Sequence, residues 1–392
     1  MRHDRSVTLS GQKYDLYRLE SGPSEKVTMN EEEATYALKT MNYIRRTESK
    51  AAELYRMRLI NGFLHLYSGQ EAVAVGMKMS IKDADSLITA YRCHGFAMVF
   101  GVSAREVLAE LMGRRTGVSR GKGGSMHMYA TQFYGGDGIV GGQVPIGAGL
   151  AFAQKYRGTG GVAWALYGDG AASQGQLHEA YNMSKLWSLP VVYVCENNKY
   201  GMGTVVERHS ANTLFYTRGD LIPGIKVTST APPSARKNSR RGSFFEFQVD
   251  GMKVLDVREA ARFARDYALR NGPIILEMTT YRYFGHSMSD PGTSYRSRDE
   301  VKTVRTEQDP IALLGRLAVE KGLKTEEEVR VRKFSVPRSF ESEISDGRIG
   351  EKMSLNRAFF RIAQNHAAKE SVFSYRCLKL IVLRLTVSFP FR

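Results

Sequence analysis

A carboxylate and an amide each follow an apolar run in the middle of the chain, and both side chains can hold a divalent cation. Asp169 lies in the GDG turn at 168–170, after the run Val162–Tyr167, and Asn198 follows the run Leu189–Cys195. Carboxylate and amide oxygens suit Mg²⁺, which takes further ligands from water and phosphate. Glycines allow close backbone approach to a phosphate. These residues alone predict either a magnesium-bridged diphosphate site or a glycine turn with an unrelated asparagine.

The elements that must position these side chains follow from the same stretch. Val162–Tyr167 and Leu189–Cys195 are apolar enough for buried strands, and Gln174–Trp187 has apolar residues at helical spacing. This order predicts a parallel βαβ unit. Open α/β sheets bind ligands beyond the carboxyl ends of their strands, which is where Asp169 and Asn198 stand. The positive amino end of the helix faces the same point.

The GDG turn and an ENN motif about thirty residues later resemble the motif of thiamin-diphosphate enzymes. The flanking sequence resembles the alpha subunits of first components of pyruvate dehydrogenase complexes, from about Tyr14 to Lys226 and from Val249 to about Val329. The resemblance implies an α/β fold, with helices on both faces of a parallel twisted sheet and an N-terminal helical extension. It also implies thiamin diphosphate and Mg²⁺ as cofactors.

The resemblance further implies site residues. The metal ligands are expected to be Asp169, Asn198 and the backbone carbonyl of Tyr200. Contacts with the organic cofactor are expected at Tyr91, Arg92, Gly138, Val140, Gly168, Asp169, Gly170, Ala171, Asn198 and His286.

Two histidines are the implied catalytic residues. His65 lies in FLHLYSGQEA and His286 in YRYFGHSMSDPG, and both segments resemble family motifs. Tyr91 and Ala130 join His65 as implied substrate contacts. Without the resemblance, a lone histidine is more simply a packed or solvent-facing side chain. His94 is expected to be structural.

Serines in the same loop are implied regulatory sites. Ser287 and Ser294 match positions at which a dedicated kinase switches the family off, while Val205 replaces a third serine. Phosphate on Ser287 would add about two negative charges beside an anionic cofactor. Ordinary loop polarity is the alternative explanation.

The composition narrows the function classes. The formal charge of +16 suggests nucleic-acid binding, but half of it comes from 227–248 and 334–392, and no basic stripe with interleaved aromatics stands out elsewhere. No apolar run is long enough to cross a bilayer. The three cysteines are far apart in sequence, which indicates free thiols and not a disulfide or zinc framework.

The chain divides into four predicted parts. Residues 1–30 form an N-terminal segment that matches a transit peptide poorly, and residues 31–330 form the dehydrogenase domain. Within the domain, 227–248 is Pro-, Ser- and Arg-rich and interrupts the resemblance. It begins with Val and ends with Gln, as an in-frame retained intron would. The tail at 331–392 also departs from the family, which suggests a gene-model error.

Several further elements are expected. Asn30 and three glutamates should begin a helix reaching Ile60, and Ser103 with Glu106 forms a capping box. Other expected elements are a strand at Leu87–Arg92, a helix at Pro145–Tyr156, a helix capped by Asp256 and ending at Asn271, and a strand at Ile274–Met278. The glycine-dense stretch Gly113–Gly149 is expected to be a loop around a ligand.

The implied activity is oxidative decarboxylation of pyruvate, with transfer of the acetyl unit to lipoyl groups, in the mitochondrial matrix. The implied partners are a beta subunit in a heterotetramer, a lipoyl acetyltransferase, and a kinase and phosphatase. A beta subunit would supply the glutamate that activates the cofactor. The alternatives are a branched-chain 2-oxoacid or acetoin dehydrogenase alpha subunit and a non-catalytic paralogue. Without a Walker loop, a nucleotide- or nucleic-acid-binding protein is disfavoured.

Overall fold

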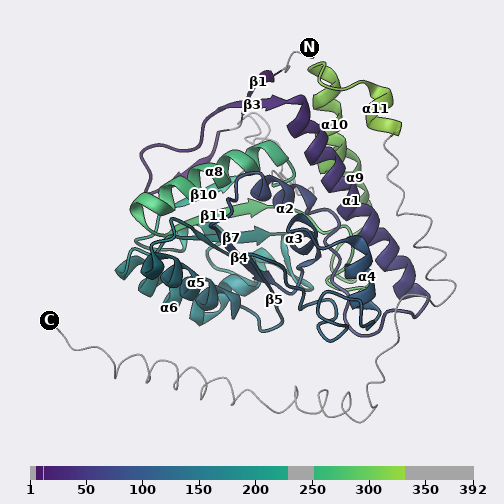
Figure 1. The fold of residues 1–392 in the computed structure, drawn as a ribbon, viewed down its shortest axis with the longest axis horizontal. Coiled ribbons are helices and arrows are strands. Elements are labelled where there is room, and N and C mark those ends of the chain that lie inside the picture. Colours follow the sequence, from purple (N-terminus) through teal and green to yellow (C-terminus); the bar gives the residue numbers. More distant parts are fainter. Residues whose placement is uncertain (1–5, 12, 228–250, 332–392) are drawn as a thin grey trace, which may run out of the picture. The chain divides into compact units, whose positions relative to one another are not determined.

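A seven-stranded sheet is the centre of the computed structural model, which describes residues 6–11, 13–227 and 251–331 (Figure 1). The strand order is β2-β10-β11-β7-β6-β4-β5. Six strands are parallel to their neighbours, and β2 pairs antiparallel with β10 at one edge. The strands are β2 Asp15–Tyr17, β4 Ser86–Ala90, β5 Phe133–Asp137, β6 Ala163–Gly168, β7 Val191–Asn197, β10 Gly224–Val227 and β11 Ile274–Thr279.

Helices cover both faces of this sheet, so the predicted α/β class is confirmed. The main helices are α1 Glu31–Arg56, α2 Glu71–Lys78, α3 His94–Val99, α4 Ala104–Leu111, α5 Gln143–Arg157, α6 Gly175–Leu186 and α8 Val254–Asn271. In Figure 1, α5 and α6 lie on one side of the sheet and α8 lies on the other. Three further helices, α9 Arg298–Glu307, α10 Pro310–Glu320 and α11 Glu326–Val331, follow the last strand.

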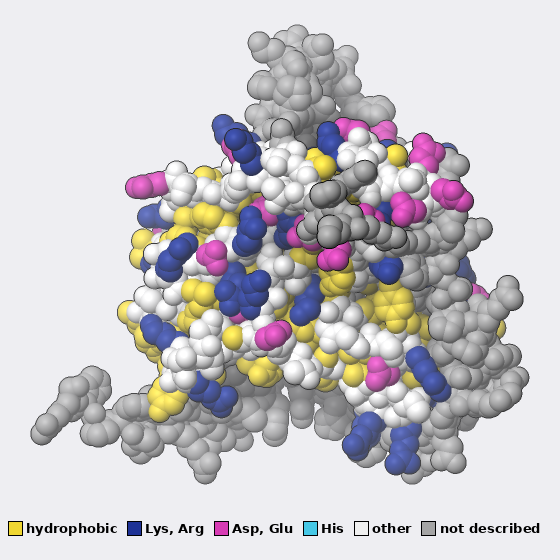
Figure 2. Space-filling model, turned by 45° about the horizontal axis from the view of Figure 1, so that its top comes forward, with side chains coloured by type: hydrophobic (Ala, Val, Ile, Leu, Met, Phe, Trp, Pro, Cys, Tyr) yellow, Lys and Arg dark blue, Asp and Glu magenta, His cyan; other side chains and the backbone are white. Residues whose placement is uncertain are grey.

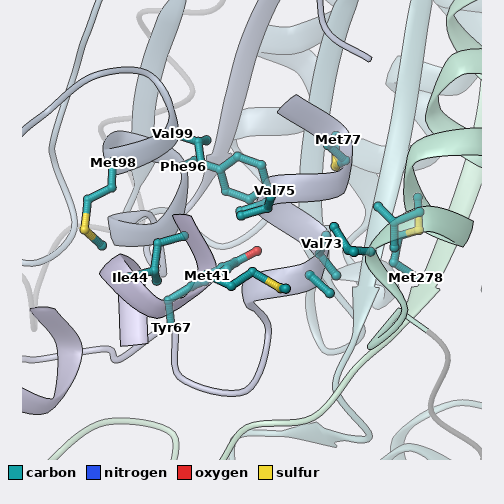
Figure 3. Close-up of a cluster of buried hydrophobic side chains, with 14 of the residues drawn as sticks. Met41, Ile44, Tyr67, Val73, Val75, Met77, Phe96, Met98, Val99 and Met278 are labelled. Atoms are coloured by element: carbon teal, nitrogen blue, oxygen red, sulfur yellow. The ribbon is translucent and has the colours of Figure 1, made fainter. Parts of the chain in front are cut away.

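Strand β7 shows how alternating side chains build two cores. Val192 and Val194 pack in the cluster that includes residues of α1, α2, α3 and α8. Val191, Tyr193 and Cys195 pack on the opposite face with residues of α5 and α6. Because neighbouring strand residues point to opposite faces, a strand covered on both sides must be apolar throughout. Figure 3 shows the part of the first core where α1, α2 and α3 meet.

The N-terminal residues add strands that the sequence did not reveal. β1 Ser6–Ser10 pairs antiparallel with β3 Lys26–Asn30, and β2 extends the main sheet. Helix α1 then begins at the predicted cap Asn30, whose Oδ1 accepts from the Glu33 amide at 2.8 Å, and the two residues form a capping box. The helix ends at Arg56 and not at the predicted Ile60, because Arg58 adopts a left-handed backbone conformation (φ 61°).

Other boundaries also differ from expectation. Helix α8 begins at Val254, so Asp256 lies within its first turn and is not the cap. The expected loop at 113–149 contains edge strand β5 and the start of α5. A Cβ on Gly136 of β5 would lie 2.3 Å from the Met126 carbonyl oxygen. Only glycine fits at this position, because the main chain of Met126 passes so close to the strand. The capping box at Ser103 and Glu106 is confirmed in α4.

Short elements complete the described chain. These are the 3₁₀ turns Ala171–Ser173 and Phe215–Thr217, the β8–β9 pair Tyr200–Gly201 and Thr204–Val205, and helix α7 Val206–His209. Apart from Val227 and Val331, the predicted insertion and the atypical tail lie outside the described residues. No helix in the described chain is both long and apolar enough to cross a bilayer.

Charged side chains are mixed on the visible surface. Figure 2 shows Lys and Arg side chains interspersed with Asp, Glu and apolar side chains, without a continuous basic stripe on that face. This agrees with the distribution of charge along the sequence and does not indicate a nucleic-acid groove there.

Candidate active site

A cavity of about 230 Å³ lies where the carboxyl ends of β4, β6 and β7 meet. Register explains the convergence: Gly168 at the end of β6 is level with Glu196 in β7, and Asn197 is level with Thr279 of β11. The turns that follow these strands therefore open toward one point, as the parallel topology predicts. The cavity is bordered by Tyr91, Arg92, Val140, Gly168, Asp169, Gly170, Ala171, Asn198, Tyr200 and His286, all of them predicted site residues.

Asp169 is buried in the turn that follows β6. Its Oδ1 accepts from the Asn198 amide at 3.3 Å, whereas Oδ2 has no hydrogen-bond partner among the described atoms. His209 Nε2 lies 3.6 Å from Oδ2, and it too has no hydrogen-bond partner in the described chain. A buried carboxylate oxygen without a partner is costly unless a cation or donor completes it.

Arg282 connects the other two predicted metal ligands. Its Nε donates to Asn198 Oδ1 at 3.0 Å, and its Nη2 donates to the Tyr200 carbonyl at 3.1 Å. These two oxygens therefore already converge on one positive charge. Asp169 borders the same cavity, and oxygens of these three kinds are the ligand type that Mg²⁺ takes. The described residues contain no cluster of three or more His, Cys, Asp or Glu, and this donor set does not need one.

Two buried guanidinium groups give the cavity a positive wall. Arg92 donates to the carbonyls of Leu66 and His286 at 2.6 and 2.8 Å, and neither Arg92 nor Arg282 pairs with a carboxylate in the described chain. Burial, reinforced by Arg282, lowers the pKa of Arg92 to about 10. Burial likewise lowers the pKa of Arg282. Buried positive charge without a direct carboxylate partner in the described chain fits an anionic ligand such as a diphosphate.

The two predicted catalytic histidines lie together beside this wall. His65 and His286 have ring centroids 5.2 Å apart, and the Tyr91 hydroxyl lies 2.8 Å from His286 Nε2. Burial and the charge of Arg92 lower the pKa of His65 to about 2 and that of His286 to about 3. Both rings are therefore neutral at physiological pH, and His65 Nδ1 has no partner in the described chain.

The structure places the remaining predicted residues outside the cavity lining. His65 is next to it through Tyr91, at a ring separation of 4.6 Å. Gly138 is exposed in the loop before α5, and Ala130 is half-buried beside β5. Ser287 is buried with its hydroxyl 2.8 Å from that of Ser289, whereas Ser294 is exposed.

Sequence reasoning missed several residues that shape the cavity. Arg282, Gln70 and Glu196 all border it. Gln70 Oε1 accepts from Asn198 Nδ2 at 3.2 Å, and burial raises the pKa of Glu196 to about 7. The position of Arg282 directly after strand β11 was an available signal, because loops at that edge reach the ligand.

The fold and site together define a doubly wound α/β protein with a positively lined cavity at the carboxyl edge of its sheet. The sequence model described as "Dehydrogenase E1 component" matches residues 39–243 and 242–344. A probable mitochondrial pyruvate dehydrogenase E1 component subunit alpha of Caenorhabditis elegans is 53% identical over 316 residues, which are 80% of this chain and 74% of that protein.

Two mammalian proteins are similarly related. The somatic mitochondrial pyruvate dehydrogenase E1 alpha subunits of Sus scrofa and Homo sapiens are 52% and 51% identical over 325 residues, covering 83% of this chain and 78% of each relative. The chain belongs to the dehydrogenase E1 component family, which depends on thiamin diphosphate. The predicted family and its oxidoreductase class are thereby confirmed.

Proposed function

We propose that this chain is the alpha subunit of a pyruvate dehydrogenase that decarboxylates pyruvate and transfers the acetyl unit to lipoyl groups. The observation that carries the proposal is that Asp169, Asn198 and Tyr200 border one positively lined cavity, where Asp169 Oδ2 has no hydrogen-bond partner in the described chain and the Asn198 and Tyr200 oxygens accept from Arg282. The cavity lies in a chain about half identical to proteins named pyruvate dehydrogenase E1 alpha subunits.

Different residues of the chain would hold the metal ion, the diphosphate and the aminopyrimidine. Asp169, Asn198 and the Tyr200 carbonyl bind Mg²⁺, and the backbone at Gly168, Gly170 and Ala171 meets the diphosphate together with Tyr91 and Arg92. Gly138 and Val140 meet the aminopyrimidine. When bound, thiamin diphosphate accepts the electron pair released as carbon dioxide leaves the substrate.

The neutral histidines orient the substrate and the loop. His65 hydrogen-bonds the 2-oxoacid, for which its unpartnered Nδ1 is available, and Tyr91 and Ala130 are further substrate contacts. His286 is held by Tyr91 through its ring and by Arg92 through its carbonyl. A neutral imidazole can donate or accept without placing a charge beside the substrate carboxylate.

The proposal also includes the proteins with which this chain assembles and the enzymes that regulate it. The chain works in the mitochondrial matrix as a heterotetramer of two alpha and two beta chains, and passes the acetyl unit to a lipoyl acetyltransferase. A kinase and phosphatase act on Ser287 and Ser294. Burial of Ser287 means that its loop must open before a kinase can reach the hydroxyl.

The test uses the chain co-expressed with a pyruvate dehydrogenase beta subunit. Calorimetry with thiamin diphosphate and Mg²⁺ measures cofactor binding, and carbon dioxide release from pyruvate and from branched-chain 2-oxoacids measures turnover. We expect cofactor binding and a clear preference for pyruvate. A preference for branched-chain substrates would favour that dehydrogenase instead, and failure to bind cofactor in an assembled complex would identify a non-catalytic paralogue.

A further inference from the structure

Three residues outside the cavity form a buried hydrogen-bonded chain that ends at the main chain of His65. Glu48 of α1, His94 of α3 and Ser125 of the glycine-rich loop are each at most 5% exposed. His94 Nδ1 lies 2.8 Å from Glu48 Oε1, and His94 Nε2 lies 2.9 Å from Ser125 Oγ and 3.1 Å from the Ser125 carbonyl oxygen. The His65 amide donates to Ser125 Oγ at 3.0 Å.

Every hydrogen bond between Glu48 and the His65 amide can be assigned one donor and one acceptor. The carboxylate of Glu48 accepts from His94 Nδ1–H. A neutral His94 then accepts from the Ser125 hydroxyl at Nε2, and a charged His94 donates there to the Ser125 oxygens. In both protonation states Ser125 Oγ keeps a lone pair for the His65 amide.

The Ser-His-Glu order resembles that of a hydrolase triad, but its surroundings exclude a nucleophilic role. Ser125 Oγ is engaged by the His65 amide, and Ser125 is only 5% exposed and does not border the cavity of the candidate active site. An acyl group therefore has no path to the hydroxyl. The hydrogen bonds of these three residues instead restrain the main chain at His65.

The loop that carries Ser125 is itself fixed upstream. Buried Glu110 of α4 accepts from the amides of Ser119, Gly121, Gly123 and Gly124 at 2.7–3.1 Å. On the opposite side of His65, the Leu64 carbonyl accepts from the Met288 amide at 2.9 Å. The main chain at 64–65 is thus held between a rigid loop and the loop that follows His286.

We propose that Glu48, His94 and Ser125 are positioning residues that fix the main chain at His65 and thereby aim its ring at the substrate. The inference deepens the proposed function and rests on it for the role of His65. The ring has no hydrogen bond of its own at Nδ1, so packing and the two main-chain anchors set its direction.

The test compares Ser125→Ala with Ser80→Ala in the chain assembled with a beta subunit. Ser80 is a matched control because it is also a buried serine, donating to the Arg258 carbonyl at 2.8 Å between α2 and α8. For Ser125→Ala we expect kcat/KM for pyruvate to fall roughly 10-fold, with the thiamin diphosphate Kd unchanged. We also expect the His65 amide to exchange hydrogen about 10-fold faster than in the wild type.

For Ser80→Ala, kcat/KM and exchange at His65 should match the wild type. The proposal is overturned if Ser125→Ala behaves like Ser80→Ala, or if it loses cofactor binding as much as turnover, which would indicate a general structural role. His94→Gln gives the same comparison if Ser125→Ala does not fold. An inactive wild-type complex would instead refute the proposed function, while the exchange measurement would still decide the positioning role.

Discussion

Individual side chains around the cavity are buried with incomplete hydrogen bonding or charge pairing. Asp169 Oδ2 lacks a hydrogen-bond partner, and Arg92 and Arg282 lack carboxylate partners within the described chain. Such groups destabilise an empty site. They are tolerated where a ligand completes them, and the proposed function assigns that role to a metal and a diphosphate.

The neutral state of His65 makes stability depend on pH. Its pKa is lowered to about 2, whereas an unfolded histidine titrates near 6.5. Between these values the unfolded chain binds more protons, so stability falls as the pH decreases below about 6.5, and His65 by itself contributes about 2 kcal/mol of that fall between pH 7 and pH 5. Urea unfolding at both pH values measures this. His65→Gln should show a smaller loss, and an equal loss in both proteins would contradict the assignment.

At the level of elements, the predictions were correct for helices and strands whose positions are determined by apolar runs or by helix caps. Strands β6 and β7 and helix α6 are within two residues of the predicted bounds, because buried apolar runs and apolar residues at helical spacing carry strong local signals. Edge strands β2 and β5 escaped prediction. β5 contains two glycines, and its strand conformation comes from pairing with β4, which no local pattern encodes.

Site residues, too, were predictable from the sequence only where a local pattern marks them. The positions of Asp169 and Asn198 were predictable from strand ends, whereas Arg282 was missed because its role depends on the contact of its loop with the Asn198 and Tyr200 oxygens. The end of α1 was misplaced because a left-handed residue, Arg58, stops the helix without glycine or proline. Tertiary contacts, not residue type, decided these cases.

Helix α5 offers a prediction from two glycines on the same helix. A Cβ on Gly147 would lie 2.4 Å from Ala165 Cβ in β6, whereas a Cβ on Gly149 would have no atom within 4 Å. Gly147→Ala should lower the free energy of unfolding by about 1–3 kcal/mol through overpacking. Gly149→Ala should raise it by up to about 1 kcal/mol through helix propensity. Denaturant unfolding measures both, and equal effects would mean that α5 does not pack so closely on β6.

At the scale of the whole molecule, the two cores bury two of the three cysteines, and Cys377 lies outside the described residues. Cys93 and Cys195 are free and buried, and burial raises the pKa of Cys93 to about 12 and that of Cys195 well above its usual value. Only thiolates react rapidly with alkylating agents. Peptide mass spectrometry after iodoacetamide treatment should therefore find both cysteines unlabelled in the native protein and labelled in denaturant. Rapid native labelling would show that the two cores open locally.

The most direct test of the metal-bridged diphosphate site is calorimetry of thiamin diphosphate with Mg²⁺ on Asp169→Ala in the complex with a beta subunit. Asp220→Asn is the control, since Asp220 carries an exposed carboxylate that does not border the cavity. We predict that Asp169→Ala weakens binding at least about 100-fold, because loss of a metal ligand exceeds the effect of changing an outer-shell residue. Asp220→Asn should bind like the wild type. Equal affinity in all three proteins would contradict the account.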